Sequence, residues 1–223
     1  MKKIFFPLLF LSLFTAGCAR QQTLISTYLA DSLANGQLPA QASYAVIPNQ
    51  NVPNPILDLR IKRKLEALLS HQDFRLAPET GADYWVTYSY GMEGHKGERS
   101  TLMGFPSYYV TGSGDDAVVS TLGYTTVINE PYTEYTSRLR LRVVEAELMR
   151  TDKRESVVWV AEAHASGSSP DLRSVLDYLL ASCFYYFGKD TGETREIRFL
   201  EEDKLLQTSR NATVNPAAAP EAA

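Results

Sequence analysis

The sequence predicts an α+β fold: a single antiparallel, or mixed, β-sheet with two main helices packed on one face. Two amphipathic segments at residues 54–69 and 169–188, and two segments of strand-like pattern at residues 137–148 and 157–165, carry this prediction. A helix with one apolar stripe must bury that stripe, and a half-buried sheet offers the surface for it. Residues 42–200 are long enough for one domain around a single core.

The segments before the first helix are short. Residues 23–29 mix β-branched and aromatic residues and favour a first strand, with a short helix as the alternative. Residues 44–48 form an apolar run that ends at a proline, which is typical of a buried strand.

The first helix has a clear start. Asn54 can cap it, and Pro55 suits the first helical position. Apolar residues then recur at helical spacing, at Leu57, Ile61, Leu65 and Leu68. Basic residues lie mostly off that stripe, at Arg60, Lys62, Arg63 and Lys64. We interpret them as a solvated helix face; contact with anionic head groups or lipopolysaccharide phosphates is the alternative.

Strands are expected at residues 74–76 and 83–90, followed by a Tyr- and Gly-rich excursion at residues 91–133. An excursion of this length is either a hairpin or a mobile functional loop. The next two strands form an antiparallel pair. If its turn centres on Asp152, Arg142 faces Glu162 and Arg140 faces His164; the first of these pairs places opposite charges together on a wet face.

The second helix is expected to start at Ser169 and Pro170. Its apolar stripe consists of Leu172, Val175, Leu176, Leu179 and Cys183. A last strand is expected at residues 194–200. Residues 201–223 are rich in polar residues and alanine, and we expect a disordered C-terminal tail.

The N-terminus carries the pattern of a bacterial lipoprotein signal. Two lysines precede an apolar stretch at residues 4–14, and small residues then lead directly to Cys18. This order is typical of a secretory signal, and the apolar run is too short to span a bilayer. We expect residues 1–17 to be removed and residues 18–41 to form a tether that is lipidated on Cys18.

A lipidated Cys18 predicts stable attachment to a membrane, because two or more acyl chains anchor a protein firmly. Ala19, rather than aspartate, follows the cysteine. By similarity to lipoprotein sorting signals, this favours the periplasmic side of the outer membrane, with surface exposure as an open alternative. Cys183 then has no disulfide partner, and we interpret it as a buried small hydrophobic residue.

The order of elements resembles the DUF4136 family of bacterial lipoproteins, a domain of unknown function. The similarity rests on residues 44–48, the proline-led helix, the strand at residues 82–86 and the later Val158-Trp159 strand, and it covers roughly residues 40–187. It implies a compact α/β domain on a lipid anchor, and it supplies no catalytic residue.

Charge and motifs limit the chemistry. Removal of the signal takes away two of the 22 basic residues and none of the 26 acidic ones, so the net charge falls from −4 to −6 and argues against a nucleic-acid partner. The sequence has no Gly-x-Ser-x-Gly elbow and no phosphate-binding loop. No cofactor or metal is expected beyond the covalent lipid. A ligand-binding or hydrolytic cleft near His95, which lies between Glu93 and Glu98, is the alternative.

The first hypothesis is therefore a non-enzymatic lipoprotein that binds or scaffolds an envelope protein or a glycan. Rings that carry hydroxyl groups suit such partners, although packing within the sheet is the default role for strand tyrosines. The candidate partner surface consists of Tyr108, Tyr109, Tyr124, Tyr132, Arg60, Arg63 and Lys64.

Overall fold

The computed structural model describes residues 21–33, 36–39, 41–49, 52–111, 118–151 and 156–212, with the backbone alone at residues 104–111 and 118–124. Cys18 and the signal lie outside this part of the chain. The strands are β1 (Gln22–Leu29), β2 (Ser43–Val46), β3 (Arg75–Leu76), β4 (Tyr84–Thr111), β5 (Val118–Glu145), β6 (Val157–Gly167) and β7 (Arg195–Arg198). The helices are α1 (Pro55–His71), α2 (Ala146–Thr151), α3 (Leu176–Tyr185) and α4 (Lys204–Asn211), with a 3-10 turn at Leu172–Ser174.

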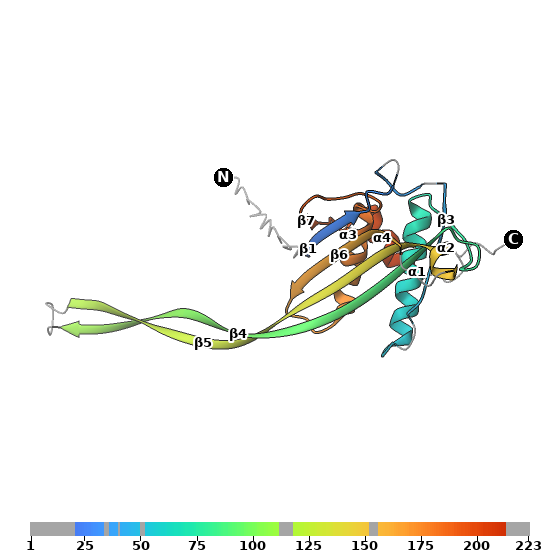
Figure 1. Ribbon diagram of the computed structural model, residues 1–223. Coiled ribbons are helices and arrows are strands. Elements are labelled where there is room, and N and C mark those ends of the chain that lie inside the picture. The colour runs from blue at the N-terminus through green and yellow to red at the C-terminus, as the bar shows by residue number, and fades with distance from the viewer. Residues whose placement is uncertain are drawn as a thin grey trace, which may run out of the picture.

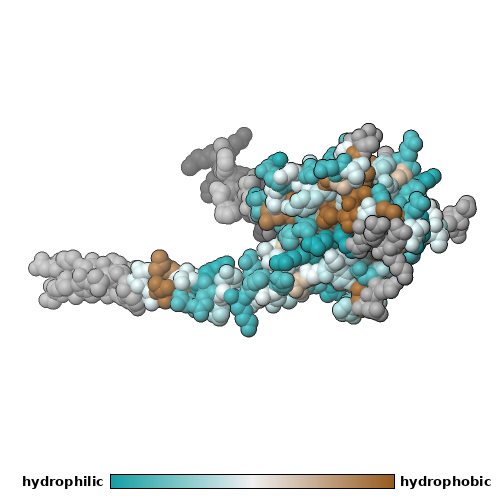
Figure 2. All heavy atoms as spheres, in the orientation of Figure 1, coloured by the Kyte–Doolittle hydropathy of each residue, from teal (hydrophilic) through white to brown (hydrophobic). Residues whose placement is uncertain are grey.

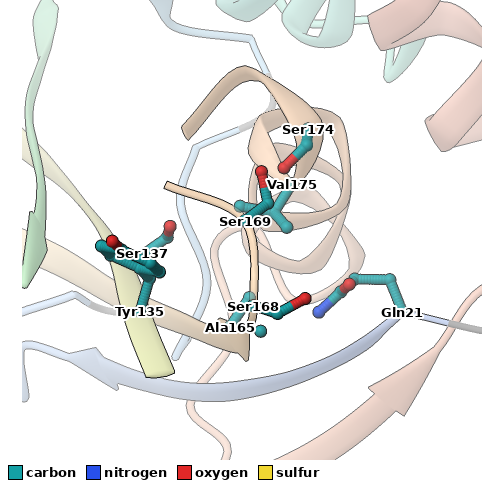
Figure 3. A pocket seen from close by; sticks show the side chains of 9 residues that line it. Gln21, Tyr135, Ser137, Ala165, Ser168, Ser169, Ser174 and Val175 are labelled. Carbon is teal, nitrogen blue, oxygen red and sulfur yellow. The ribbon is translucent and has the colours of Figure 1, made fainter. Parts of the chain in front are cut away.

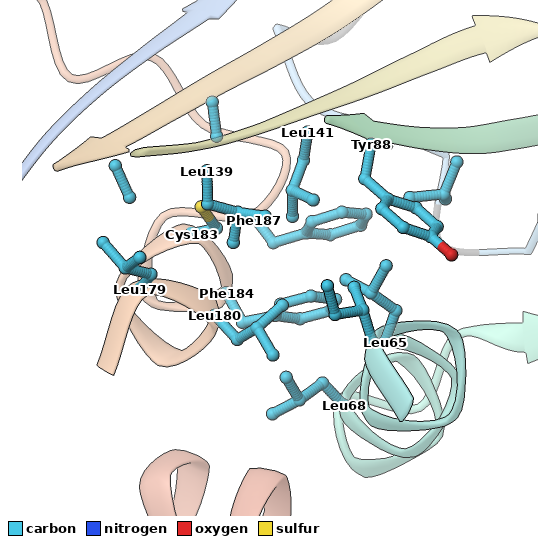
Figure 4. Close-up of a cluster of buried hydrophobic side chains, with 14 of the residues drawn as sticks. Leu65, Leu68, Tyr88, Leu139, Leu141, Leu179, Leu180, Cys183, Phe184 and Phe187 are labelled. Carbon is cyan, nitrogen blue, oxygen red and sulfur yellow. The ribbon is translucent and has the colours of Figure 1, made fainter. Parts of the chain in front are cut away.

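These elements confirm the α+β fold. The seven strands form one mixed sheet in the order β3-β2-β4-β5-β6-β1-β7, and α1 and α3 pack on the same face (Figure 1). Among the strand pairs of the described chain, those of β2 with β3 and with β4 are parallel and the others are antiparallel. Between the sheet and the helices lies a core of apolar side chains from both layers, which includes Tyr88, Leu139, Leu141, Leu65, Leu180 and Phe184 (Figure 4).

Helix α1 begins as its sequence predicts. The side chain of Asn54 accepts a hydrogen bond from the backbone N–H of Leu57 at 3.0 Å, and Pro55 is the first helical residue. Ile61, Leu65 and Leu68 are fully buried, and Leu57 is partly buried. Cys183 on α3 is also buried, as expected.

The predicted register between β5 and β6 is wrong by two residues. Arg140, rather than Arg142, lies opposite Glu162, and their side chains form an ion pair at 2.5 Å; Arg138 lies opposite His164. The cause is α2, which occupies residues that the prediction gave to a continuous strand. The shift of register between Val143 and Val144 acts in the opposite direction: Val144 lies opposite Val157, three residues from its predicted partner, and Val143 lies opposite Trp159, two residues from its predicted partner.

Two predicted boundaries also need correction. The packed chain starts at Gln22, inside the expected tether, because β1 is an inner strand between β6 and β7. The expected disorder from residue 201 is wrong for residues 201–212, because these include α4. Asp203 caps this helix by accepting from the N–H of Leu205 at 3.0 Å, and Leu206 is fully buried. Residues 213–223 lie outside the described chain.

Candidate interaction surface

The most prominent feature is a long two-stranded extension of the sheet. Strands β4 and β5 pair without interruption from Tyr84–Glu145 to Thr111–Val118. The pairing of β2 with β4 stops at Val86, and β6 pairs with β5 only from Tyr135 onward. Residues 91–111 and 118–134 therefore project from the body as two strands without neighbours, which we call the ribbon (Figure 1). Of the two alternatives for residues 91–133, the structure shows the hairpin.

Glycine–tyrosine pairs across the strands hold the ribbon together. The ring of Tyr132 lies over Gly97, where an added Cβ atom would come within 2.7 Å of it. Tyr135 covers Gly94 in the same way, at 3.1 Å. The guanidinium of Arg99 lies 5.5 Å from the centre of the Tyr132 ring. Such aromatic cover compensates for glycine in a strand, but a two-stranded hairpin remains marginally stable in water.

The ribbon carries an exposed apolar cluster. Leu102 lies directly opposite Val127, and their side chains are 72% and 58% exposed; Met103, beside them, is 47% exposed. Figure 2 shows this cluster as an apolar patch on the extension, away from the body. Apolar side chains that gather on a protein surface are typical of a contact site. No pattern in the sequence distinguishes these residues, because the apolar and β-branched residues of a strand do not show whether a second layer covers it.

The structure separates the residues of the predicted partner surface. Tyr132 is exposed on the ribbon, whereas Arg60 and Arg63 are exposed on α1, which packs on the body. Tyr108, Tyr109 and Tyr124 belong to the ribbon strands, with backbone partners Thr121, Ser120 and Phe105. Their side chains lie outside the described structure.

Lys64 does not belong to an exposed surface. Its side chain is buried, with Nζ at 2.6 Å from Oδ1 of Asp177 on α3 and at 2.5 Å from the carbonyl oxygen of Ser209 on α4. Lys64 falls next to the apolar stripe of α1, and the carboxylate on α3 together with the carbonyl oxygen on α4 compensates for the burial of its charge. The prediction for this residue is therefore wrong.

His95 lies on the ribbon and is largely exposed. Its Nε2 atom is 3.9 Å from Oε2 of Glu93, and Glu134 is its cross-strand partner. Within the described chain, no three His, Cys, Asp or Glu side chains are grouped to hold a metal ion. The described helices include none that is long and apolar enough to cross a membrane.

Two hollows lie where the ribbon joins the body. One, of about 320 Å³, is lined by Gln21, Tyr135, four serines, a glycine and two apolar residues, and the tyrosine is its one titratable side chain (Figure 3). The other, of about 280 Å³, is lined by Tyr90, Arg138, Arg140, Glu162 and His164, among others. Neither hollow includes His95.

His164 makes the second hollow sensitive to pH. Burial lowers the pKa of its imidazole below the ordinary value of 6.5, and the charge of Arg138 lowers it further, while Glu162 acts in the opposite direction. The unfolded chain therefore binds more protons than the folded chain below about pH 6.5, and folding stability is lost as the pH falls.

We expect the free energy of unfolding to fall between pH 7 and pH 5, and His164→Gln to reduce that fall. Urea unfolding at several pH values measures it. The matched control is His71→Gln at the exposed end of α1, which should keep the dependence of the parent protein. An unchanged pH dependence in His164→Gln would refute this assignment.

Comparisons with known proteins add distant likenesses. No protein-family model and no curated protein matches the chain. The crystal structure of a PDZ domain protein from Parabacteroides distasonis is similar over 79% of this chain and 39% of its own, with 12% identity and a TM-score of 0.42. The PelC dodecamer from Paraburkholderia phytofirmans is similar over 70% of this chain and 91% of its own, with 14% identity and a TM-score of 0.33. The chain spans about two fifths of the first of these, and neither identifies a family.

Proposed function

We propose that this chain is a non-enzymatic lipoprotein of the bacterial outer membrane, anchored through Cys18 on the periplasmic side, which binds or scaffolds an envelope protein through its ribbon. The observation that carries the proposal is the ribbon itself. It exposes both faces, two backbone edges and an apolar cluster around Leu102 and Val127. Unpaired strand edges are templates for a further strand, so a protein fits them better than a glycan does.

The position of β1 defines how the anchor would hold the body. Three residues separate Cys18 from Gln22, the first residue of β1. Four residue steps span at most about 14 Å when fully extended. A lipid on Cys18 would therefore keep the end of the sheet where β1 begins close to the membrane surface, and the ribbon would extend the reach of the chain from there.

The experiment compares two variants with the parent protein in cells. The first replaces residues 94–135 with Asn-Gly, a two-residue turn that closes β4 onto β5 at the paired residues Glu93 and Thr136. We expect it to stay in the membrane fraction, to unfold at a similar temperature, and to lose the chemical cross-links that the parent forms with envelope proteins.

The second variant, Cys18→Ser, removes the acceptor of the lipid. We expect it to leave the membrane fraction while its fold, measured by circular dichroism, is retained. Cross-links that persist in the ribbon-shortened variant would refute the role of the ribbon. Membrane association that persists in Cys18→Ser would refute the anchor.

A further inference from the structure

The free edge of β4 differs from every other edge of the described sheet. Edge strands β3 and β7 have two and four residues, and β7 alternates Arg and Glu with one isoleucine. The free edge of β5 has Pro131, which has no N–H, flanked by Glu130 and close to Glu134. Short length, charge and proline are the features that protect edges against pairing. Between Gly91 and Phe105, β4 has no proline and contains four glycines.

The backbone directions on β4 follow from its contact with the body. The N–H of Ile47 donates to the carbonyl oxygen of Val86 at 3.0 Å, so Val86 directs its backbone groups away from β5. Directions alternate along a strand, and the β4–β5 register is unbroken, so even-numbered residues of β4 point to the free edge. By the same alternation, the backbone groups of Pro131 on β5 point to the opposite free edge. Because proline has no N–H, it cannot donate a hydrogen bond to a further strand at that edge.

We propose that two copies of this chain pair antiparallel along their β4 edges, with Gly97 opposite Gly97, so that two ribbons form one four-stranded sheet. This inference rests on the proposed function, because it takes the ribbon as the contact arm and names its partner. Gly97 is odd-numbered, so the two glycines form a non-hydrogen-bonded pair, and the even residues on either side supply the hydrogen bonds.

This register makes the two edges complementary. Lys96 of each copy lies opposite Glu98 of the other, which gives two ion pairs related by a twofold axis. Neither side chain has another ion-pair partner among the described residues. Met92 lies opposite Leu102, so the exposed apolar side chains of one ribbon meet those of the other. An isologous contact of this kind closes as a dimer.

The two registers in which the twofold axis is shifted by one residue are less favourable, because they place like charges opposite each other. If the twofold axis passes through residue 96, Lys96 faces Lys96 of the second copy; if it passes through residue 98, Glu98 faces Glu98. Like charges directly opposite each other destabilise a strand pair. The pairing of residues 91–103 also ends before Pro106, which lacks the N–H that an even position would supply to this edge. The charges therefore disfavour both neighbouring registers, and the proline limits the length of the pairing.

Charge-exchange variants test the pairing. They are made in the full mature chain with Cys18→Ser, because a chain without lipid does not enter micelles that would bring copies together. We expect a dimer in analytical ultracentrifugation. Lys96→Glu and Glu98→Lys should each raise the dissociation constant about tenfold or more, since each turns two attractive pairs into repulsive ones. The double variant restores opposite charges and should return to within about threefold of the parent. Lys204→Glu at the start of α4, a matched charge change, should have no effect.

Cysteines test the register itself. In this register His95 of one copy lies opposite Arg99 of the other as a non-hydrogen-bonded pair, with Cα atoms about 4.5 Å apart, which suits a disulfide. Chains with His95→Cys co-expressed with chains with Arg99→Cys should form the mixed disulfide. Each alone should stay reduced, because identical positions lie about 13 Å apart along the strands; Cys183 is buried.

A monomeric parent at about 100 µM, or a double charge exchange that fails to restore association, would overturn this inference. The proposed function has a separate readout. If the parent is monomeric but the ribbon-shortened variant loses its cross-links to other envelope proteins, the self-pairing is wrong and the contact role of the ribbon stands. If shortening the ribbon changes neither association nor cross-links, both are wrong.

Discussion

Replacing Trp159 with alanine is expected to lower the free energy of unfolding by about 4 kcal/mol. Trp159 on β6 is almost fully buried, and its ring packs edge-on against Phe187, with centroids 4.8 Å apart. Its Nε1 donates a hydrogen bond to the carbonyl oxygen of Lys189 at 3.0 Å, which ties the segment after α3 to the sheet. Alanine would leave a cavity and would remove one of the two hydrogen bonds that the Lys189 carbonyl oxygen accepts, the other coming from the hydroxyl of Thr27. Urea unfolding of the unlipidated chain measures the change.

Trp159→Phe is the matched control. It keeps most of the apolar volume but removes the donor, so its expected loss of stability is about 1–2 kcal/mol. Equal losses for the two variants would show that the hydrogen bond, and not the packing, dominates. A loss below about 1 kcal/mol for alanine would contradict the placement of this side chain in the core.

Lys64→Met is expected to cost about 3 kcal/mol of folding stability. The substitution leaves the Asp177 carboxylate, whose side chain is 22% exposed, without its cation, and it removes the donor to the carbonyl oxygen of Ser209. Both groups belong to the contact by which α1 and α3 hold α4. Loss of the contact should also release α4, which hydrogen exchange of residues 204–211 detects as faster exchange than in the parent.

Lys62→Met on the same helix provides the comparison. Lys62 pairs with Glu66 one turn later at 3.7 Å, and both side chains are about one-third exposed. Exposed pairs of this spacing contribute little, so the expected loss is below about 0.5 kcal/mol. If both lysine variants lose the same small amount, the buried contact of Lys64 with Asp177 does not form in solution.

The periodicity of apolar residues predicted the helices and strands of the body, because each of these elements has one buried side. The apolar stripe of α1 and the alternation of Leu139, Leu141 and Val143 each correspond to a side of an element that meets the core. Register, in contrast, depends on what lies between the strands. The sequence of α2 is not distinguishable by pattern from the end of β5, so the pairing of Arg140 with Glu162 appeared only in the structure.

Long-range partners account for the other errors. The capping aspartate and Leu206 form a helix only because α1 and α3 offer a surface to it, whereas the local composition favours disorder. Lys64 is buried for the same reason. In the ribbon the difficulty is reversed: the β-branched and aromatic residues of this segment indicate strands, and nothing in them reveals that no second layer covers the strands. The exposure of Leu102 and Val127 therefore had no sequence signal.

Site-specific photo-cross-linking in cells tests the contact role of the ribbon most directly. A photoreactive residue in place of Leu102 is compared with one in place of Ile56, which is 69% exposed at the start of α1 on the body. The account predicts a discrete light-dependent cross-linked product from position 102 and none from position 56. A product from both positions alike, or none from position 102, would contradict it.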